Sequence, residues 1–237
     1  MPLNTAASSR MDTRAITNAP LATVSAQLAD AVGDMQPVSF RSGAVLRETD
    51  DTENVFFLDD GLVGLQVSLG NGRCVEAAAL GRDAVVGVES LFRNGARSVC
   101  RAIAYTPVAA HALSRDVVVR LVGESAAFRH EIFRALGDTQ MAAMRRVACA
   151  RFHSVGERVA RWLLIARSHI GDSIPLPHAV IADALGCRRS GVTVAMLRLR
   201  DAGVVSYTRA AIRIVNPAGL AQETCGCAPS APDASAR

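Results

Sequence analysis

The chain has 237 residues, of which 50% are hydrophobic and 20% charged, as in globular proteins with one large domain or two modest ones. Charged residues and glycines break every apolar run well before the roughly 18 residues of a membrane span, and residues 1–35 hold no continuous apolar segment typical of a secretory signal. The net charge is +4 and all 26 basic residues are arginine, and we expect a cytoplasmic protein with no membrane contact.

The N-terminal half is predicted to be a flexible arm followed by a small β domain. Residues 1–36 show little periodicity apart from a short amphipathic helix expected at 21–34. Between residues 37 and 114, seven short apolar runs are separated by turn signals, and Asp60-Gly61 and Asn71-Gly72 are typical of hairpins. Short strands at regular spacing predict an antiparallel β-barrel or jelly roll.

Residues 115–152 change to a helical period. An apolar stripe follows one side of the segment and includes Phe128, Ile132, Leu136, Ala143 and Val147, with Phe133 and Met144 beside it. A single helix of this length exceeds the usual globular length. We expect it to be a dimerisation helix that pairs with a second copy of itself; the alternative is that it packs only on the barrel.

Residues 153–220 fit a winged helix–turn–helix. A helix at 154–169 is followed by a break, a short helix at about 178–185, a turn at Gly186 and a longer helix at about 188–202 that Gly203 caps. Val192, Met196 and Leu199 recur at helical spacing and predict the buried face of the second helix. The alternating segment at 204–215 predicts a hairpin wing, and residues 221–237 a disordered tail.

The buried stripe also predicts which side chains reach solvent. In a helix–turn–helix the second helix enters the major groove with its N-terminus first. Residues 146–213 carry 11 arginines against 4 acidic residues, whereas residues 1–145 carry 14 against 16, and arginine forks match phosphates and guanine edges. We expect DNA contacts from Arg188, Arg189, Ser190, Thr193, Arg198 and Arg209. The alternative is an ordinary helical hairpin with a solvated arginine-rich face.

The stretch VIADALGCRRSGVTVAMLRLRDAGVVSY, residues 180–207, resembles the DNA-binding segment of the Crp–Fnr superfamily of bacterial transcription regulators. The order of elements is also similar over roughly residues 37–220. The resemblance implies an α+β chain made of a cyclic-nucleotide-binding-like barrel, a dimerisation helix and a winged helix–turn–helix. It further implies that the protein is a homodimer that binds double-stranded DNA, and it suggests RNA polymerase as a second partner. It assigns guanine recognition to Arg189, and base or phosphate contacts to Ser190 and Thr193. Ser190 and Gly191 depart from the larger polar residues common there, so the base preference is not assigned.

The resemblance also implies an effector pocket in the barrel, formed by Gly87, Glu89, Arg97 and Ser98. In cyclic-AMP-binding members a Gly-Glu pair holds the ribose and an Arg-Ser pair the phosphate. Here Val88 occupies the position of the ribose glutamate and Glu89 follows one residue late. In an extended strand such a shift turns the side chain to the opposite face, so the effector is left unknown and a cyclic nucleotide is not assigned.

Neither a metal site nor an enzyme is predicted. The six cysteines form no CxxC pair, and Cys225 and Cys227 lie in the polar tail with no further ligands evident near them in sequence. His111, His130 and His153 match no haem-binding motif. Gly-rich phosphate loops, HExxH and nucleophile elbows are all missing from the sequence. The remaining alternative is a cyclic-nucleotide-responsive sensor whose helical region acts through a protein partner.

Overall fold

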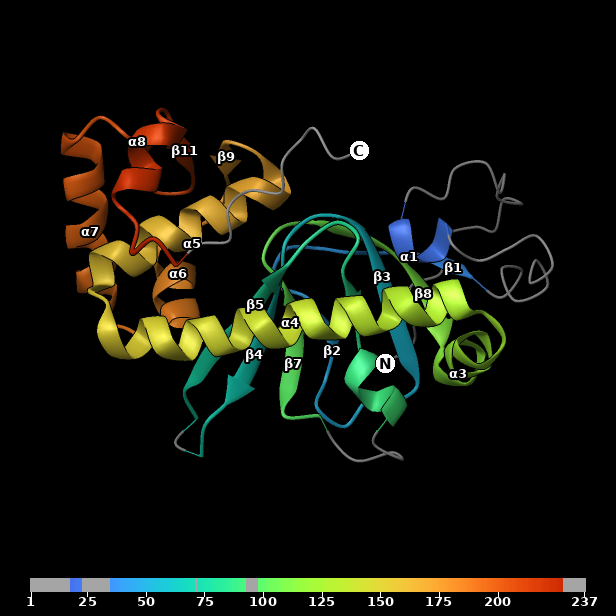
Figure 1. Ribbon diagram of the computed structural model, residues 1–237. Coiled ribbons are helices and arrows are strands. Elements are labelled where there is room, and N and C mark those ends of the chain that lie inside the picture. Colours follow the sequence, from blue (N-terminus) through green and yellow to red (C-terminus); the bar gives the residue numbers. More distant parts are fainter. Residues whose placement is uncertain (1–17, 23–34, 71, 93–97, 228–237) are drawn as a thin grey trace.

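The computed structural model describes residues 18–22, 35–70, 72–92 and 98–227 (Figure 1). Helix α1 (Ala19–Ala22) precedes the β domain, and most of the helix expected at 21–34 lies outside the described residues, as does Arg97. None of the described helices is long and apolar enough to cross a membrane.

The β domain consists of two four-stranded antiparallel sheets, as a jelly roll does, and they do not close into a single barrel. One sheet has the order β1-β8-β3-β6 and the other β2-β7-β4-β5. Leu58 of the first sheet and Ala78 of the second belong to one apolar core, whereas Phe57, the neighbour of Leu58 on β3, belongs to a second core with Phe128 and Ile132. The strands are β1 (Gln36–Phe40), β2 (Val45–Arg47), β3 (Asn54–Asp60), β4 (Val63–Ser68), β5 (Cys74–Leu80), β6 (Val85–Val86), β7 (Cys100–Ala104) and β8 (Val108–Ser114).

Of the two expected hairpins, one forms. β4 and β5 pair as a hairpin, and Gly72 in their connection has φ +77°; Asn71 lies outside the described residues. The prediction of a hairpin at Asp60-Gly61 is wrong, because β3 and β4, which flank it, belong to different sheets. Gly61 does adopt φ +96°, and a Cβ there would lie 2.3 Å from the carbonyl oxygen of Pro107. The glycine therefore serves a close crossing between the sheets, which a local turn signal cannot distinguish from a hairpin.

The helical region that follows contains two helices, where the sequence predicts one. α3 (Arg115–Glu124) ends at Ser125, whose hydroxyl accepts a hydrogen bond from the backbone N–H of Phe128 and so caps α4 (Ala126–Phe152). Serine is a strong N-cap residue, which explains the break. α4 runs along the outside of the jelly roll and carries the chain to the C-terminal domain (Figure 1).

The C-terminal domain has the predicted winged helix–turn–helix, with one additional strand, β9, and one additional helix, α8. It comprises α5 (Val155–Ile170), β9 (Ser173–Ile174), α6 (His178–Leu185), α7 (Arg189–Asp201), β10 (Val205–Tyr207), β11 (Ile212–Ile214) and α8 (Pro217–Gln222). β10 and β11 form the wing hairpin, and β9 pairs with β11. Gly203, with φ +71°, follows the end of α7 by two residues.

The tail differs from the sequence prediction of disorder in residues 221–227. α8 extends to Gln222, and residues 223–227 continue to the junction of α4 and α5, where Cys225 lies against Cys149. Residues 228–237 lie outside the described part of the chain.

Candidate DNA-binding face and effector pocket

The orientation of α7 is fixed by its apolar side. Val192 and Met196 are fully buried and Leu199 is 3% exposed, in a core that also contains Trp162 of α5 and Ile181 of α6. This confirms the predicted buried face. The opposite side of α7 is therefore the side that faces solvent.

The turn before α7 has the geometry that the Gly-Cys pair predicts. Gly186 ends α6 with φ +62°, a left-handed conformation that suits glycine. Arg188 is the N-cap of α7 and makes no side-chain capping bond, so the first backbone N–H groups of the helix are not capped by a side chain. Such groups, together with the helix dipole, favour a phosphate oxygen. Burial and the charge of Arg189 both lower the pKa of His178, which lies beside this helix start.

The predicted contact residues lie around this helix start and on the wing. Arg188, Arg189, Ser190 and Arg198 are exposed on α7, and Arg209 is exposed in the turn between β10 and β11. Thr193 is half-buried, and its hydroxyl donates to the carbonyl oxygen of Arg189 at 3.1 Å. Among the described residues, none of these four arginines forms an ion pair with a carboxylate.

Two further residues share this surface and were missed from the sequence. Val194 is 51% exposed on α7 next to Thr193, and an exposed aliphatic group there could contact a thymine methyl. Arg213 is exposed between buried Ile212 and Ile214 on β11. The alternation of the segment AIRIV, which places its middle residue outward, was the signal for Arg213.

Part of the positive charge that the sequence assigned to DNA has another use. Arg146 pairs with Glu76, Arg161 is only 5% exposed, Arg167 pairs with Asp172, and Arg200 pairs with Asp201. The local excess of arginine in the sequence therefore overstates the charge available to a phosphate backbone. Arg188, Arg189, Arg198 and Arg209 retain their charge for such a contact, because none of them pairs with a carboxylate in the described part of the chain.

A buried polar network joins the jelly roll to the C-terminal domain. Glu76 of β5 has a fully buried side chain that pairs with Arg146 of α4 and accepts the indole N–H of Trp162 at 3.2 Å. Arg146 Nε also donates to the carbonyl oxygen of Glu76 at 2.7 Å. Burial and the neighbouring Arg161 and Arg158 lower the pKa of Arg146, because all three disfavour a positive charge there. The carboxylate of Glu76 opposes this effect by pairing with the guanidinium.

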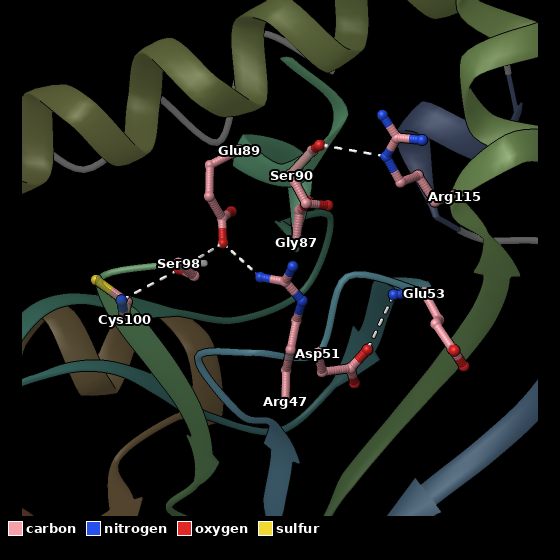
Figure 2. A network of polar contacts seen from close by, with 9 residues as sticks. All are labelled: Arg47, Asp51, Glu53, Gly87, Glu89, Ser90, Ser98, Cys100 and Arg115. Carbon is pink, nitrogen blue, oxygen red and sulfur yellow. Dashed lines mark hydrogen bonds and ion pairs between the residues drawn. The ribbon is translucent and has the colours of Figure 1, made fainter. Parts of the chain in front are cut away.

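Glu89 and Ser98, two of the residues expected to hold an effector, lie together in a polar cluster, although the segment is not extended. Gly87, with φ +96°, leads into a 3₁₀ helix (Val88–Phe92), which places Val88 in the core and turns Glu89 towards Arg47 and Ser98 (Figure 2). The expectation that Glu89 points to the opposite face is wrong for this reason. Its carboxylate accepts hydrogen bonds from Arg47 Nη1 at 2.5 Å and Ser98 Oγ at 2.9 Å.

Arg47 is the pocket residue that the sequence did not reveal. It is 2% exposed on β2, and its Nε and Nη2 are buried with no hydrogen-bond partner among the described residues. Gly87 allows this approach, because a Cβ there would lie 3.2 Å from Arg47 Nε. Buried guanidinium N–H groups without acceptors are costly, and they indicate a position where an anionic oxygen would fit.

A hollow lies between the jelly roll and the helix–turn–helix. It has a volume of about 670 Å³ and is lined by residues of both parts, including Arg101, Tyr105, Asp183 and Gly186. Arg101 donates to Gln66 Oε1 at 3.1 Å on its floor. Burial raises the pKa of Tyr105 to about 12, so its hydroxyl stays protonated and acts as a hydrogen-bonding group.

These features define a class of protein: a jelly roll with a buried polar cluster, connected by a long helix to a winged helix–turn–helix that presents exposed arginines around the start of its second helix. Comparisons with known proteins agree. Family models for a cyclic nucleotide-binding domain and for a Crp-like helix-turn-helix domain match residues 37–125 and 157–223. The global nitrogen regulator of Synechocystis sp. is 29% identical over 90% of this chain and 99% of its own length.

Solved structures show the same fold. The FixK2 structure from Bradyrhizobium japonicum superposes with a TM-score of 0.68 at 19% identity, covering 80% of this chain and 97% of that one. A transcriptional regulator of the CRP family from Thermus thermophilus gives 0.68 at 20% identity, covering 82% and 99%. The chain belongs to the Crp–Fnr superfamily and is a DNA-binding transcription regulator.

Proposed function

We propose that the protein acts in the cytoplasm as a homodimer on a two-fold symmetric DNA site. α7 enters the major groove, Arg189 binds a guanine edge, and Arg188, Ser190, Thr193 and Arg198 contact neighbouring bases and phosphates. Arg209 on the wing binds the backbone. The observation that carries this proposal is the outward position of the α7 arginines opposite the buried Val192–Met196–Leu199 stripe. Regulation through contact with RNA polymerase belongs to the same proposal, and no step of it requires catalysis.

The dimer interface that we propose is the outer face of α4. Phe128 and Ile132 pack on the jelly roll, but Phe133, Met144 and Val147 are 51%, 56% and 74% exposed. Phe133 and Val147 are 14 residues, or two heptads, apart, and Met144 precedes Val147 by three residues. This is the spacing of the a and d positions of a coiled coil, so the three side chains lie on one face of α4. Exposed apolar side chains in such a row favour pairing with a second copy over solvation.

We expect the double change Met144→Glu with Val147→Glu to convert the dimer to a monomer, because it places like charges opposite one another in the seam. Affinity for a two-fold site should fall by about 100-fold or more, since the second half-site no longer binds in the same molecule. Sedimentation equilibrium and fluorescence anisotropy measure the two effects. Val119→Glu, at a 43% exposed position on α3, is the control. A double variant that stays dimeric excludes this interface.

The DNA site itself is best found by selection from random duplexes. The proposal expects an inverted repeat whose half-sites are about one helical turn apart. Binding of one dimer per duplex should weaken steeply with salt, because phosphate contacts release counterions. Enrichment of no sequence, or of a single unrepeated half-site, would contradict the symmetric arrangement. If purified protein binds no duplex and instead captures a protein through α7, the alternative sensor with a protein partner holds.

We further infer that the jelly roll binds an anionic effector between Arg47, Glu89 and Ser98. The observation that favours this is the pair of buried, unpartnered N–H groups on Arg47. Calorimetry with cyclic AMP, cyclic GMP and small dicarboxylates tests it, with Arg47→Gln as the variant and Arg41→Gln, on the same domain, as the control. Heat that is equal in the parent and in Arg47→Gln would place the ligand elsewhere, with the hollow beside Arg101 the next position to test.

A further inference from the structure

Four side chains of metal-ligating type meet where α4 ends. They are Cys149, His153, Cys225 and Cys227, and their ligand atoms all lie within 4.8 Å of one another. Cys149 is buried and the other three are half-buried. We propose that these four residues form a mononuclear zinc site that attaches the C-terminal segment to the junction of α4 and α5.

Local structure explains how two distant segments supply the ligands. Cys149 is in the last turn of α4 and His153 is its C-cap residue, a spacing of four that puts both on one side of the helix. After α8, the hydroxyl of Thr224 donates to the Ala221 carbonyl oxygen at 2.8 Å and accepts from the Gly226 N–H at 3.3 Å. Gly226 has φ +67°, and this bend turns both Cys225 and Cys227 towards α4.

The separations fit a single tetrahedral ion. With Zn–S bonds of about 2.3 Å, two thiolates on the same zinc lie ~3.8 Å apart; the Sγ atoms of Cys149 and Cys225 are 3.9 Å apart. With a Zn–N bond of about 2.0 Å, a sulfur and a nitrogen lie ~3.5 Å apart; Cys227 Sγ and His153 Nε2 are 3.4 Å apart. Three thiolates and one imidazole are a regular donor set for structural zinc.

Neighbouring charges also suit such an ion. The carboxylate of Glu157 lies 3.8 Å from Nδ1 of His153, and Nε2 is the nitrogen that faces Cys227. At this separation the carboxylate makes no hydrogen bond to the ring, and its negative charge adds to the field that attracts a cation to this cluster. The guanidinium of Arg161 lines the same small hollow as Cys149 and balances the net negative charge of three thiolates around a divalent cation.

The site would give the C-terminal segment a defined role. An ion shared by the end of α4, the first residue after it and the segment beyond α8 restrains the joint between the long helix and the helix–turn–helix. Any effect of zinc on DNA affinity rests on the function proposed above, but zinc binding itself does not, and it is measured without DNA.

The test uses the full-length chain, reduced with a non-thiol reductant and freed of metal by a chelator. Added Co²⁺ should bind at one equivalent per chain. Its spectrum should show the charge-transfer absorption of thiolate ligands and the strong visible bands of tetrahedral coordination. Added Zn²⁺ should displace the Co²⁺ and abolish these bands. Cys225→Ser with Cys227→Ser should lose these bands and bind zinc more than about 100-fold more weakly, because loss of outer carboxylates alone costs about 10–100-fold. Cys74→Ser, outside the cluster, is the matched control.

A second variant separates ligation from folding. Glu157→Gln retains an acceptor for the Ser154 N–H in the helix cap but removes the charge 3.8 Å from His153 Nδ1, and we expect its zinc affinity to fall by less than that of the Cys225→Ser with Cys227→Ser variant. Zinc should also raise the melting temperature of the parent and of Cys74→Ser but not of the tail double variant. Equal zinc affinity in the parent and the double variant, or a Cys149–Cys225 disulfide as the stable state with no metal uptake after reduction, would overturn the proposal.

Discussion

Replacing Arg189 with alanine is expected to lower affinity for the selected DNA site by about 10–100-fold and to relax base preference at one position of each half-site. The magnitude follows from the roughly 1–3 kcal/mol that a bidentate arginine–guanine contact contributes to discrimination. Arg189 is exposed at the first turn of α7 and has no carboxylate partner among the described residues, so its removal should leave folding stability unchanged.

The loss of DNA affinity, compared across duplexes of different sequence, distinguishes an arginine that contacts a base from one that contacts a phosphate. Arg209→Ala on the wing should weaken binding about equally for all duplexes, and it should reduce the slope of log affinity against log salt by about 1 for each phosphate that the variant no longer neutralises. Arg189→Ala should instead act mainly on sites that contain the preferred base. Anisotropy titrations on the selected site and on single-base variants, at several salt concentrations, separate these outcomes. Arg120→Ala, an exposed arginine on α3, is the control.

The assignment of α7 depends on this contrast. If the double change Arg188→Ala with Arg189→Ala binds as tightly and as selectively as the parent, α7 does not read the DNA. Retained selectivity with uniformly weaker binding would place these arginines on phosphates only. In that case Ser190, Thr193 and the exposed Val194 become the groups that select the sequence.

The helix–turn–helix was predictable from the sequence because its determinants are local. Gly186 is required by a left-handed turn, and Val192, Met196 and Leu199 fix the rotation of α7 within three turns of helix. Short strands at regular spacing likewise predicted an antiparallel β-barrel or jelly roll, of which the structure has the two-sheet form. The pairing of those strands was not predictable at Asp60-Gly61, since whether a turn joins neighbours or crosses between sheets depends on contacts made by Pro107, far away in the chain.

The two candidate ligand sites show the same limit. The pocket required Arg47 to lie beside Glu89, which are 42 residues apart, and a 3₁₀ turn that the apolar run around Val88 did not reveal. The cysteine cluster joins residues 76 positions apart. Cys225-Gly-Cys227 was visible as a pair of thiols, but nothing in the sequence linked this pair to Cys149, and His153 matched no motif. Only the packing of α8 against α5 brings the four together.

Glu76→Ala is expected to cause the largest loss of stability of any change considered for this chain, about 3–5 kcal/mol, because it leaves the buried guanidinium of Arg146 without its partner. The side chain of Glu76 is fully buried, and its carboxylate also accepts the indole N–H of Trp162. Trp162 is the single tryptophan of the chain, so its fluorescence reports on this network directly. Unfolding by denaturant, at one fixed protein concentration because we propose a dimer, measures the loss.

The double change Glu76→Leu with Arg146→Met decides what the network does. Removing both charges and keeping the volume should restore much of the stability that Glu76→Ala loses, since a buried ion pair often contributes little over an apolar pair of the same size. A double variant that is stable yet no longer couples effector binding to DNA affinity would show that the pair fixes the position of α4 relative to β5. A Glu76→Ala protein that unfolds within about 1 kcal/mol of the parent would contradict the buried arrangement itself, because surface charges contribute only about that much.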